Sequence, residues 1–122
     1  MRSIFFLDDS AEFLEVMKVF IENISTCSAI TASNFEYMLA QEELILKSDM
    51  AFLDINLGLH QPSGVQAYRW LRSLGYNKPV FFLTGHAIDS DETKEAHTFE
   101  GTKILRKPIS PQELLQLIGS QS

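Results

Sequence analysis

The sequence predicts a doubly wound α/β fold, with a five-stranded parallel sheet in the order 2-1-3-4-5 and helices on both faces. Short apolar runs alternate along the chain with segments in which apolar residues recur every three or four positions. The runs at 4–7, 49–54 and 79–85 are the most continuous, which is typical of strands buried on both faces. The runs at 27–32 and 102–108 mix polar with apolar residues, so we place them at the sheet edges.

The first two helices are predicted from residue spacing. A helix begins near Ser10, and its apolar face is formed by Phe13, Met17, Phe20 and Ile24. After the weak strand 27–32, the pattern Ser33-x-x-Glu36 has the form of a capping box and opens a second helix that runs to about residue 47.

Capping signals also mark the helices of the second half. Ser63-x-x-Gln66 predicts the start of a third helix that ends at Gly75, with an apolar side formed by Val65, Tyr68, Leu71 and Leu74. The segment 89–97 is almost entirely polar and predicts a short, loosely packed helix. Ser110-Pro111-x-Glu113 combines an N-cap, a proline at the first helical position and a capping-box glutamate, which opens the last helix.

Composition limits the class of protein. The chain has 122 residues, the size of a single domain, and we expect one domain over 1–122. Its net charge of −6 excludes nucleic acid and anionic membranes as expected direct partners. No apolar run approaches the roughly 20 residues that span a bilayer. Cys27 is the single cysteine, which excludes an intramolecular disulfide framework and suits a reducing, cytoplasmic location.

Chemically active side chains follow the strands at the carboxyl ends. Asp8 and Asp9 follow the first strand, Asp54 ends the third, Thr84 ends the fourth and Lys107 lies at the end of the fifth. The carboxyl ends of parallel strands meet along one edge of the sheet, which we call the carboxyl rim. Each residue alone also has a structural interpretation, as a helix start, a turn residue or a solvated lysine. Their shared position favours a functional site.

The chemistry of this set points to phosphoryl transfer. Three carboxylates repel one another unless a hard cation joins them, and Mg²⁺ prefers such oxygen ligands. A lysine ammonium offsets part of the negative charge and can hold an anion, while a threonine hydroxyl can donate to a phosphoryl oxygen. A nucleophilic carboxylate, a metal, a cation and a hydroxyl donor together form a set suited to phosphoryl transfer.

The motifs "FFLDDS", "AFLDINL", "VFFLTGHA" and "ILRKPISPQEL" resemble those of receiver domains of two-component response regulators. The resemblance covers essentially the whole chain and implies the flavodoxin-like, CheY-like (βα)5 fold. It also implies that Asp54 accepts a phosphoryl group, that Thr84 is the switch hydroxyl and that Lys107 binds the phosphate.

The resemblance further implies a Mg²⁺ site. Asp9 would bind the metal directly, Asp8 mainly through a metal-bound water, and Asp54 and the backbone carbonyl of Asn56 would complete the protein ligands. The implied phosphodonor is a phosphohistidine on a sensor histidine kinase or a histidine phosphotransfer protein. A downstream protein target or output domain would read a conformational change at the face formed by 89–97, the strand 102–108 and the last helix. A weak homodimer through that face is compatible with the resemblance.

The chain departs from the family pattern at two places. Ile104 stands where the family usually has tyrosine or phenylalanine, so the usual aromatic switch is missing from this position. The loop "GLHQPSG" also looks about two residues longer than is common.

The expected function is that of a phosphorylated signalling switch, which is not an enzyme with a free substrate. Two other functions are alternatives. A Mg²⁺-dependent phosphohydrolase of the haloacid-dehalogenase type uses similar residues, but its first strand ends in D-x-D, whereas residue 10 here is serine. A degenerate receiver that acts only as a protein-interaction module is the other alternative. The presence of the full set of site residues argues against this alternative: Asp8, Asp9, Asp54, Thr84 and Lys107.

Overall fold

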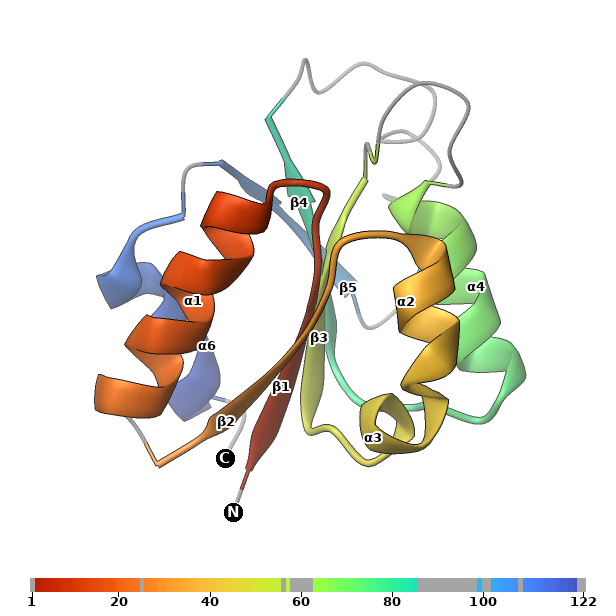
Figure 1. Cartoon of the computed structure of the whole chain (residues 1–122), viewed down its shortest axis with the longest axis horizontal. Helices are drawn as coiled ribbons and strands as arrows, with labels where there is room; N and C mark the ends of the chain where they lie inside the picture. Colours follow the sequence, from red (N-terminus) through yellow and green to blue (C-terminus); the bar gives the residue numbers. More distant parts are fainter. Residues whose placement is uncertain are drawn as a thin grey trace.

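The computed structural model describes residues 2–24, 26–55, 57, 63–85, 99, 102–107 and 109–120, and it contains the predicted sheet (Figure 1). All strand pairs are parallel, and the order is β2-β1-β3-β4-β5, which confirms the predicted topology. The strands are β1 (Ser3–Leu7), β2 (Ser28–Ala32), β3 (Met50–Asp54), β4 (Val80–Thr84) and β5 (Thr102–Arg106).

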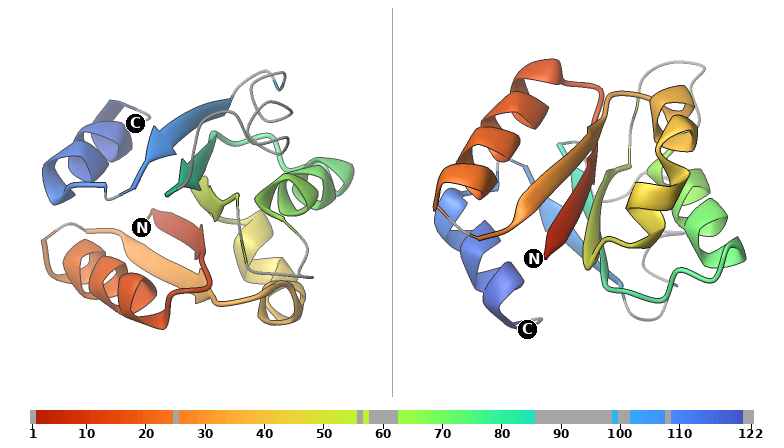
Figure 2. Two further views of the ribbon diagram at one scale, coloured as in Figure 1. Left: turned by 90° about the horizontal axis from the view of Figure 1, so that it is seen from above. Right: turned by 60° about the horizontal axis from the view of Figure 1, so that its bottom comes forward.

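Helices cover both faces of this sheet (Figures 1 and 2). The described helices are α1 (Ala11–Ile24), α2 (Phe35–Ala40), α3 (Glu42–Leu46), α4 (Gly64–Ser73) and α6 (Pro111–Ser120). The views show α1 and α6 on one face and α2, α3 and α4 on the other. The helix predicted over 89–97 lies outside the described residues. Among the described helices, none has the length and apolar character needed to cross a bilayer.

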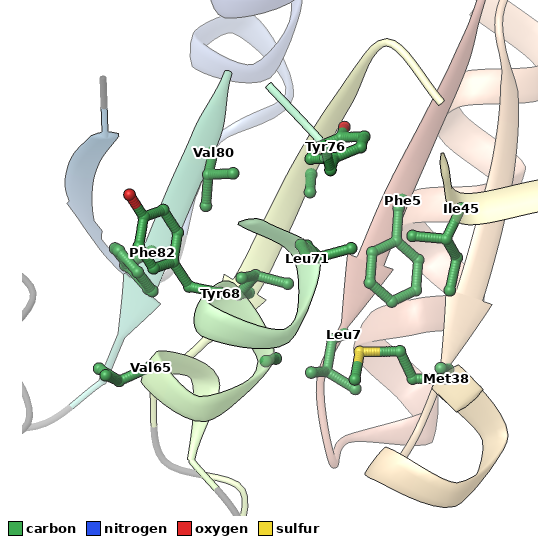
Figure 3. Close-up of a cluster of buried hydrophobic side chains, with 14 of the residues drawn as sticks. Phe5, Leu7, Met38, Ile45, Val65, Tyr68, Leu71, Tyr76, Val80 and Phe82 are labelled. Atoms are coloured by element: carbon green, nitrogen blue, oxygen red, sulfur yellow. The ribbon is translucent and has the colours of Figure 1, made fainter. Parts of the chain in front are cut away.

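The sheet separates two apolar cores. The α1-side core is formed by Ile4, Phe6, Leu14, Met17, Ile21, Cys27, Met50, Phe52, Phe81, Leu83, Ile109, Leu114 and Ile118. The α4-side core faces the other helices, and Figure 3 labels its members Phe5, Leu7, Met38, Ile45, Val65, Tyr68, Leu71, Tyr76, Val80 and Phe82. Burial on both faces explains why β3 and β4 are continuous apolar runs in the sequence.

The buried face of α1 is rotated from the predicted one. Leu14, Met17 and Ile21 are the buried residues, whereas Phe13 and Phe20 are only half-buried at its edge. The spacing of apolar residues predicts the helix correctly, but the ring of Phe13 lies at the edge of this core and against Lys107.

The predicted second helix is two short helices. Its N-cap is Asn34, whose side chain accepts a hydrogen bond from Tyr37 N at 2.9 Å, so the predicted Ser33 cap is wrong. The helix breaks at Gln41, whose φ of −114° leaves the helical region. The Gln41 side-chain amide donates to Thr31 O at 3.0 Å, which ties the break to the edge strand β2.

The ends of α4 and α6 confirm the predicted caps. Ser63 and Gln66 form the reciprocal capping box at the start of α4. Gly75 follows this helix with a φ of +88°, in the left-handed region where glycine is favoured. At the start of α6, Ser110 Oγ accepts from Glu113 N at 3.1 Å.

Candidate functional site

Strand register brings the predicted site residues to one edge. Leu7 pairs with Leu53, which places Asp8 and Asp54 side by side at the ends of neighbouring strands. Asp54 in turn pairs with Leu83, the residue before Thr84. On the far side of β4, Lys107 N donates to Thr84 O at 2.9 Å. The carboxyl rim therefore contains residues from four strands, as the sequence predicts.

Side-chain alternation divides the rim into two sides. Asp8 and Asp54 each stand two residues after a phenylalanine of the α1-side core, so they share the sheet face that α1 covers. Thr84 stands two residues after Phe82 of the α4-side core and belongs to the opposite face. A group bound by both carboxylates and Thr84 therefore has to sit on top of the rim, between the two sides.

The ammonium of Lys107 joins the two buried carboxylates. Its Nζ lies 2.5 Å from Asp8 Oδ2 and 3.3 Å from Asp54 Oδ2. The aspartates are almost fully buried, with 0% of Asp8 and 4% of Asp54 exposed. Burial works to lower the pKa of the Lys107 ammonium, but the contact with Asp8 and the charges of both aspartates outweigh it and raise the pKa above its ordinary value. Lys107 therefore carries its positive charge across the physiological pH range.

The acidic residues also fit a hard divalent cation. Asp8, Asp9 and Asp54 each offer one carboxylate oxygen, and these atoms all lie within 4.8 Å of one another. Asp8 Oδ2 is buried, and its partner among the described residues is the Lys107 ammonium, so a cation bound by this oxygen has to share it with the ammonium or displace it. Asp9 is exposed and extends the set toward solvent. Oxygen ligands with one side open to water are the set that Mg²⁺ prefers. Asn56, the other predicted ligand, lies outside the described residues.

The first turn of α1 is tied to the same carboxylate. Asp8 Oδ1 accepts a hydrogen bond from Ser10 N at 2.9 Å, and Ser10 Oγ accepts one from Phe13 N at 3.2 Å. The two carboxylate oxygens of Asp8 therefore have different partners. Oδ1 holds the start of α1 through Ser10 N, while Oδ2 contacts the Lys107 ammonium.

Two residues of this region were not predicted from the sequence. Gly64 donates its N–H to Ile55 O at 3.0 Å, and a Cβ atom at Gly64 would lie 2.3 Å from Asp54 O. This glycine permits α4 to start directly against the backbone of Asp54. Phe13 is the other, since Lys107 Nζ lies 5.0 Å from the centroid of its ring. A glycine right after an N-cap serine is a weak signal for the first, and spacing gives none for the second.

A parallel 2-1-3-4-5 sheet with buried aspartates and a lysine at its carboxyl rim defines the CheY-like class of α/β proteins. The profile of the response regulator receiver domain family matches residues 4–119. The chain belongs to the response regulator receiver domain family, which places it among two-component signalling proteins.

Solved structures show the same fold. A response regulator receiver domain protein from Clostridium thermocellum is 27% identical with a TM-score of 0.82, over 99% of this chain and 94% of that one. The chemotaxis protein CheY4 of Vibrio cholerae is 21% identical with a TM-score of 0.81, over 100% of this chain and 99% of that one. A CheY-like receiver domain protein from Methanospirillum hungatei is 22% identical with a TM-score of 0.80, over 99% and 93%. No curated protein sequence matches the chain.

Proposed function

We propose that the domain is a phosphorylation-dependent switch in which Asp54 accepts a phosphoryl group from a phosphohistidine. The supporting observation is the grouping of Asp8, Asp9 and Asp54 within 4.8 Å, with Lys107 against two of them. A carboxylate oxygen of Asp54 attacks phosphorus, the P–N bond breaks, and its electron pair returns to the imidazole of the donor. The product is an acyl phosphate on Asp54, which water later hydrolyses.

The other rim residues have distinct tasks in this proposal. Lys107 neutralises charge on the phosphoryl oxygens, since its ammonium lies beside the Asp54 carboxylate. The Thr84 hydroxyl donates to a phosphoryl oxygen from the opposite face of the sheet. Asp8, Asp9 and Asp54 would hold Mg²⁺, which, when bound, supplies further charge neutralisation of the transferring group.

The conformational change that follows phosphorylation of Asp54 involves the β5 side of the sheet. We place the responsive face at the segment 89–97, β5 and α6, and only the last two lie in the described residues. Ile104 of β5 packs on the α4-side core, as does Phe99. This region adjoins Thr84 through the pairing of β4 with β5. A change of this face would bias a pre-existing equilibrium between two conformations, which a target protein or output domain reads.

We place the docking surface for a kinase or phosphotransfer protein on the exposed side of α1, the helix whose first turn lies at the carboxyl rim. Val16 and Val19 of α1 are 58% and 54% exposed, and Glu12 and Glu15 line the same hollow. An apolar strip with an acidic border fits a partner surface of apolar and basic residues. Val16→Asp should leave labelling by acetyl phosphate unchanged and slow transfer from a phosphorylated histidine kinase. Equal slowing of both reactions would contradict the docking role.

The direct test is labelling of Asp54. Asp54→Ala should abolish phosphorylation by acetyl phosphate or by a cognate phosphorylated kinase in the presence of Mg²⁺. Asp49→Asn is the matched control, because Asp49 precedes the same strand at its other end, where its carboxylate accepts a hydrogen bond from Ser3 N at 2.8 Å. Labelling of Asp54→Ala at the wild-type level would refute the proposal. A wild-type protein that stays unlabelled while shifting no NMR signal with beryllofluoride would indicate the degenerate receiver instead.

The phosphohydrolase alternative has no support in the fold or the family match. Where that class has its second aspartate, Ser10 caps α1 and donates its N–H to Asp8. Phosphatase assays on Asp8→Asn and Asp54→Asn would still separate the two chemistries. A phosphohydrolase of this class would depend on Asp8, at the end of the first strand, as its nucleophile. A receiver would instead lose its covalent phosphoryl label with Asp54→Asn.

A further inference from the structure

Lys107 has an aromatic neighbour as well as two acidic ones. Its Nζ lies 5.0 Å from the centroid of the Phe13 ring, within the range of a cation–π interaction. Phe13 lies on the first turn of α1, half-buried and packed at the edge of the α1-side core. The ammonium is therefore bounded by Asp8 and Asp54 and by one ring face.

Hydrogen bonds hold the backbone of the helical turn that carries this ring. Ser10 Oγ accepts from Phe13 N at 3.2 Å, and Ser10 N donates to Asp8 Oδ1 at 2.9 Å. Asp8 contacts Lys107 through its other oxygen. Asp8, Ser10, Phe13 and Lys107 thus form a closed circuit of contacts, in which the carboxylate that holds the ammonium also sets the start of the helix that carries the ring.

The ring differs from the carboxylates in what can displace it. Any cation bound by Asp8 and Asp54 competes with Lys107 for the same oxygens and repels its ammonium. The Phe13 ring carries no charge. A strongly hydrated divalent ion binds oxygen ligands and therefore does not displace the ring from the Lys107 ammonium. Once a divalent cation occupies the carboxylates, the ring remains as a fixed partner that keeps the flexible lysine at the rim.

We propose that Phe13 is a positioning residue that holds the Lys107 ammonium over its ring and toward the Asp54 carboxylate. The inference rests on the proposed phosphorylation of Asp54, because it concerns the lysine that would bind the transferred group. Through Phe13, α1 would contribute a side chain to the site. Neither the alternation of side chains along the strands nor the proposed metal ligands predicts this contribution.

The kinetic test compares aromatic with aliphatic residues at this position. Initial rates of labelling are measured over a range of acetyl phosphate concentrations at saturating Mg²⁺. Phe13→Leu should lower the maximal rate constant about 5-fold, a loss within the range of one cation–π contact. Phe13→Tyr and Phe13→Trp should restore it, since both keep the ring face. Phe20→Leu is the matched control: Phe20 is another half-buried phenylalanine of α1 at the edge of the same core, two turns away.

A double-mutant cycle separates this inference from the proposed function. In a Lys107→Met background, Phe13→Leu should cause no further loss, because the partner of the ring is gone. A wild-type protein that is not labelled at Asp54 would overturn the proposed function itself. Normal labelling of wild type together with a wild-type rate for Phe13→Leu, or an undiminished loss in the Lys107→Met background, would overturn only the role of Phe13.

A spectroscopic measurement tests the contact without the reaction. The Hε protons of Lys107 should be shifted upfield by the ring current of Phe13, and Phe13→Leu should abolish that shift. The shift should persist when Mg²⁺ and beryllofluoride are added. Its loss on addition of Mg²⁺ would show that the ring does not hold the lysine in the loaded site and would refute the inference.

Discussion

The contact between Gly64 and β3, the strand that ends at Asp54, yields the sharpest quantitative prediction. A Cβ atom at this position would lie 2.3 Å from Asp54 O and 2.9 Å from Asp54 C, both backbone atoms of a central strand. An ordinary contact begins near 3.4 Å, so Gly64→Ala must separate α4 from β3 by about 1 Å. Overpacking of this kind typically costs about 1–3 kcal/mol of stability.

The same displacement acts on the site. A shift of about 1 Å in the backbone of Asp54 would move its carboxylate relative to Lys107, and misplacement on that scale can reduce a rate about 100-fold. We expect Gly64→Ala to unfold at lower urea concentration, monitored by the fluorescence of Trp70, the single tryptophan. Labelling by acetyl phosphate should fall by one to two orders of magnitude under conditions where the variant stays folded.

Gly75→Ala is the matched control for lost stability. Gly75 has a φ of +88°, and a Cβ atom there would meet no heavy atom of the described residues within 4 Å beyond its own chain neighbours. Alanine at this position therefore costs backbone strain of about 1–2 kcal/mol without touching Asp54. It should lower stability comparably and leave labelling intact. If Gly64→Ala labels as fast as Gly75→Ala, or is as stable as wild type, the close approach of α4 to Asp54 is not required and the reasoning fails.

Three further predictions concern charge, pH and helix capping. Lys107→Gln removes the ammonium that competes for Asp8, so added Mg²⁺ should raise the urea midpoint of this variant more than that of wild type. Burial raises the pKa of Tyr76 to about 12 from about 10, so stability present below pH 10 should be lost as pH rises to 12, by up to about 3 kcal/mol. Tyr76→Phe should remove that part of the pH dependence in urea unfolding; an unchanged profile would exclude Tyr76 as its source. Asn34→Ala should cost about 1 kcal/mol and Ser33→Ala much less, whereas the reverse order would restore the Ser33 cap.

Much of the fold could be predicted because strands buried on both faces leave a simple pattern. Apolar runs located all five strands, and their polarity placed β2 and β5 at the edges. The carboxyl rim followed from the same pattern, because parallel strands deliver Asp8, Asp54 and Lys107 to one edge.

The errors arose where contacts between elements decide the outcome. The helical periodicity of apolar residues does not determine whether Phe13 or Leu14 is buried in the core. In the structure Leu14 is buried, and the Phe13 ring lies against Lys107. The break at Gln41 depends on a bond to Thr31 of β2, which no local signal in a helix reveals. The close approach of Gly64 likewise depends on how α4 docks on β3.

The three stacked phenylalanines of the α1-side core have a consequence for access to the carboxylates. The rings of Phe6, Phe52 and Phe81 lie 5.1 and 5.0 Å apart, nearly parallel, which matches the spacing of the strands that carry them. They form a dry floor directly below the buried Asp8 and Asp54. Among the described residues, these rings close the approach to Asp8 and Asp54 from within the α1-side core, so ions, phosphodonor and hydrolytic water have to reach the carboxylates from the rim.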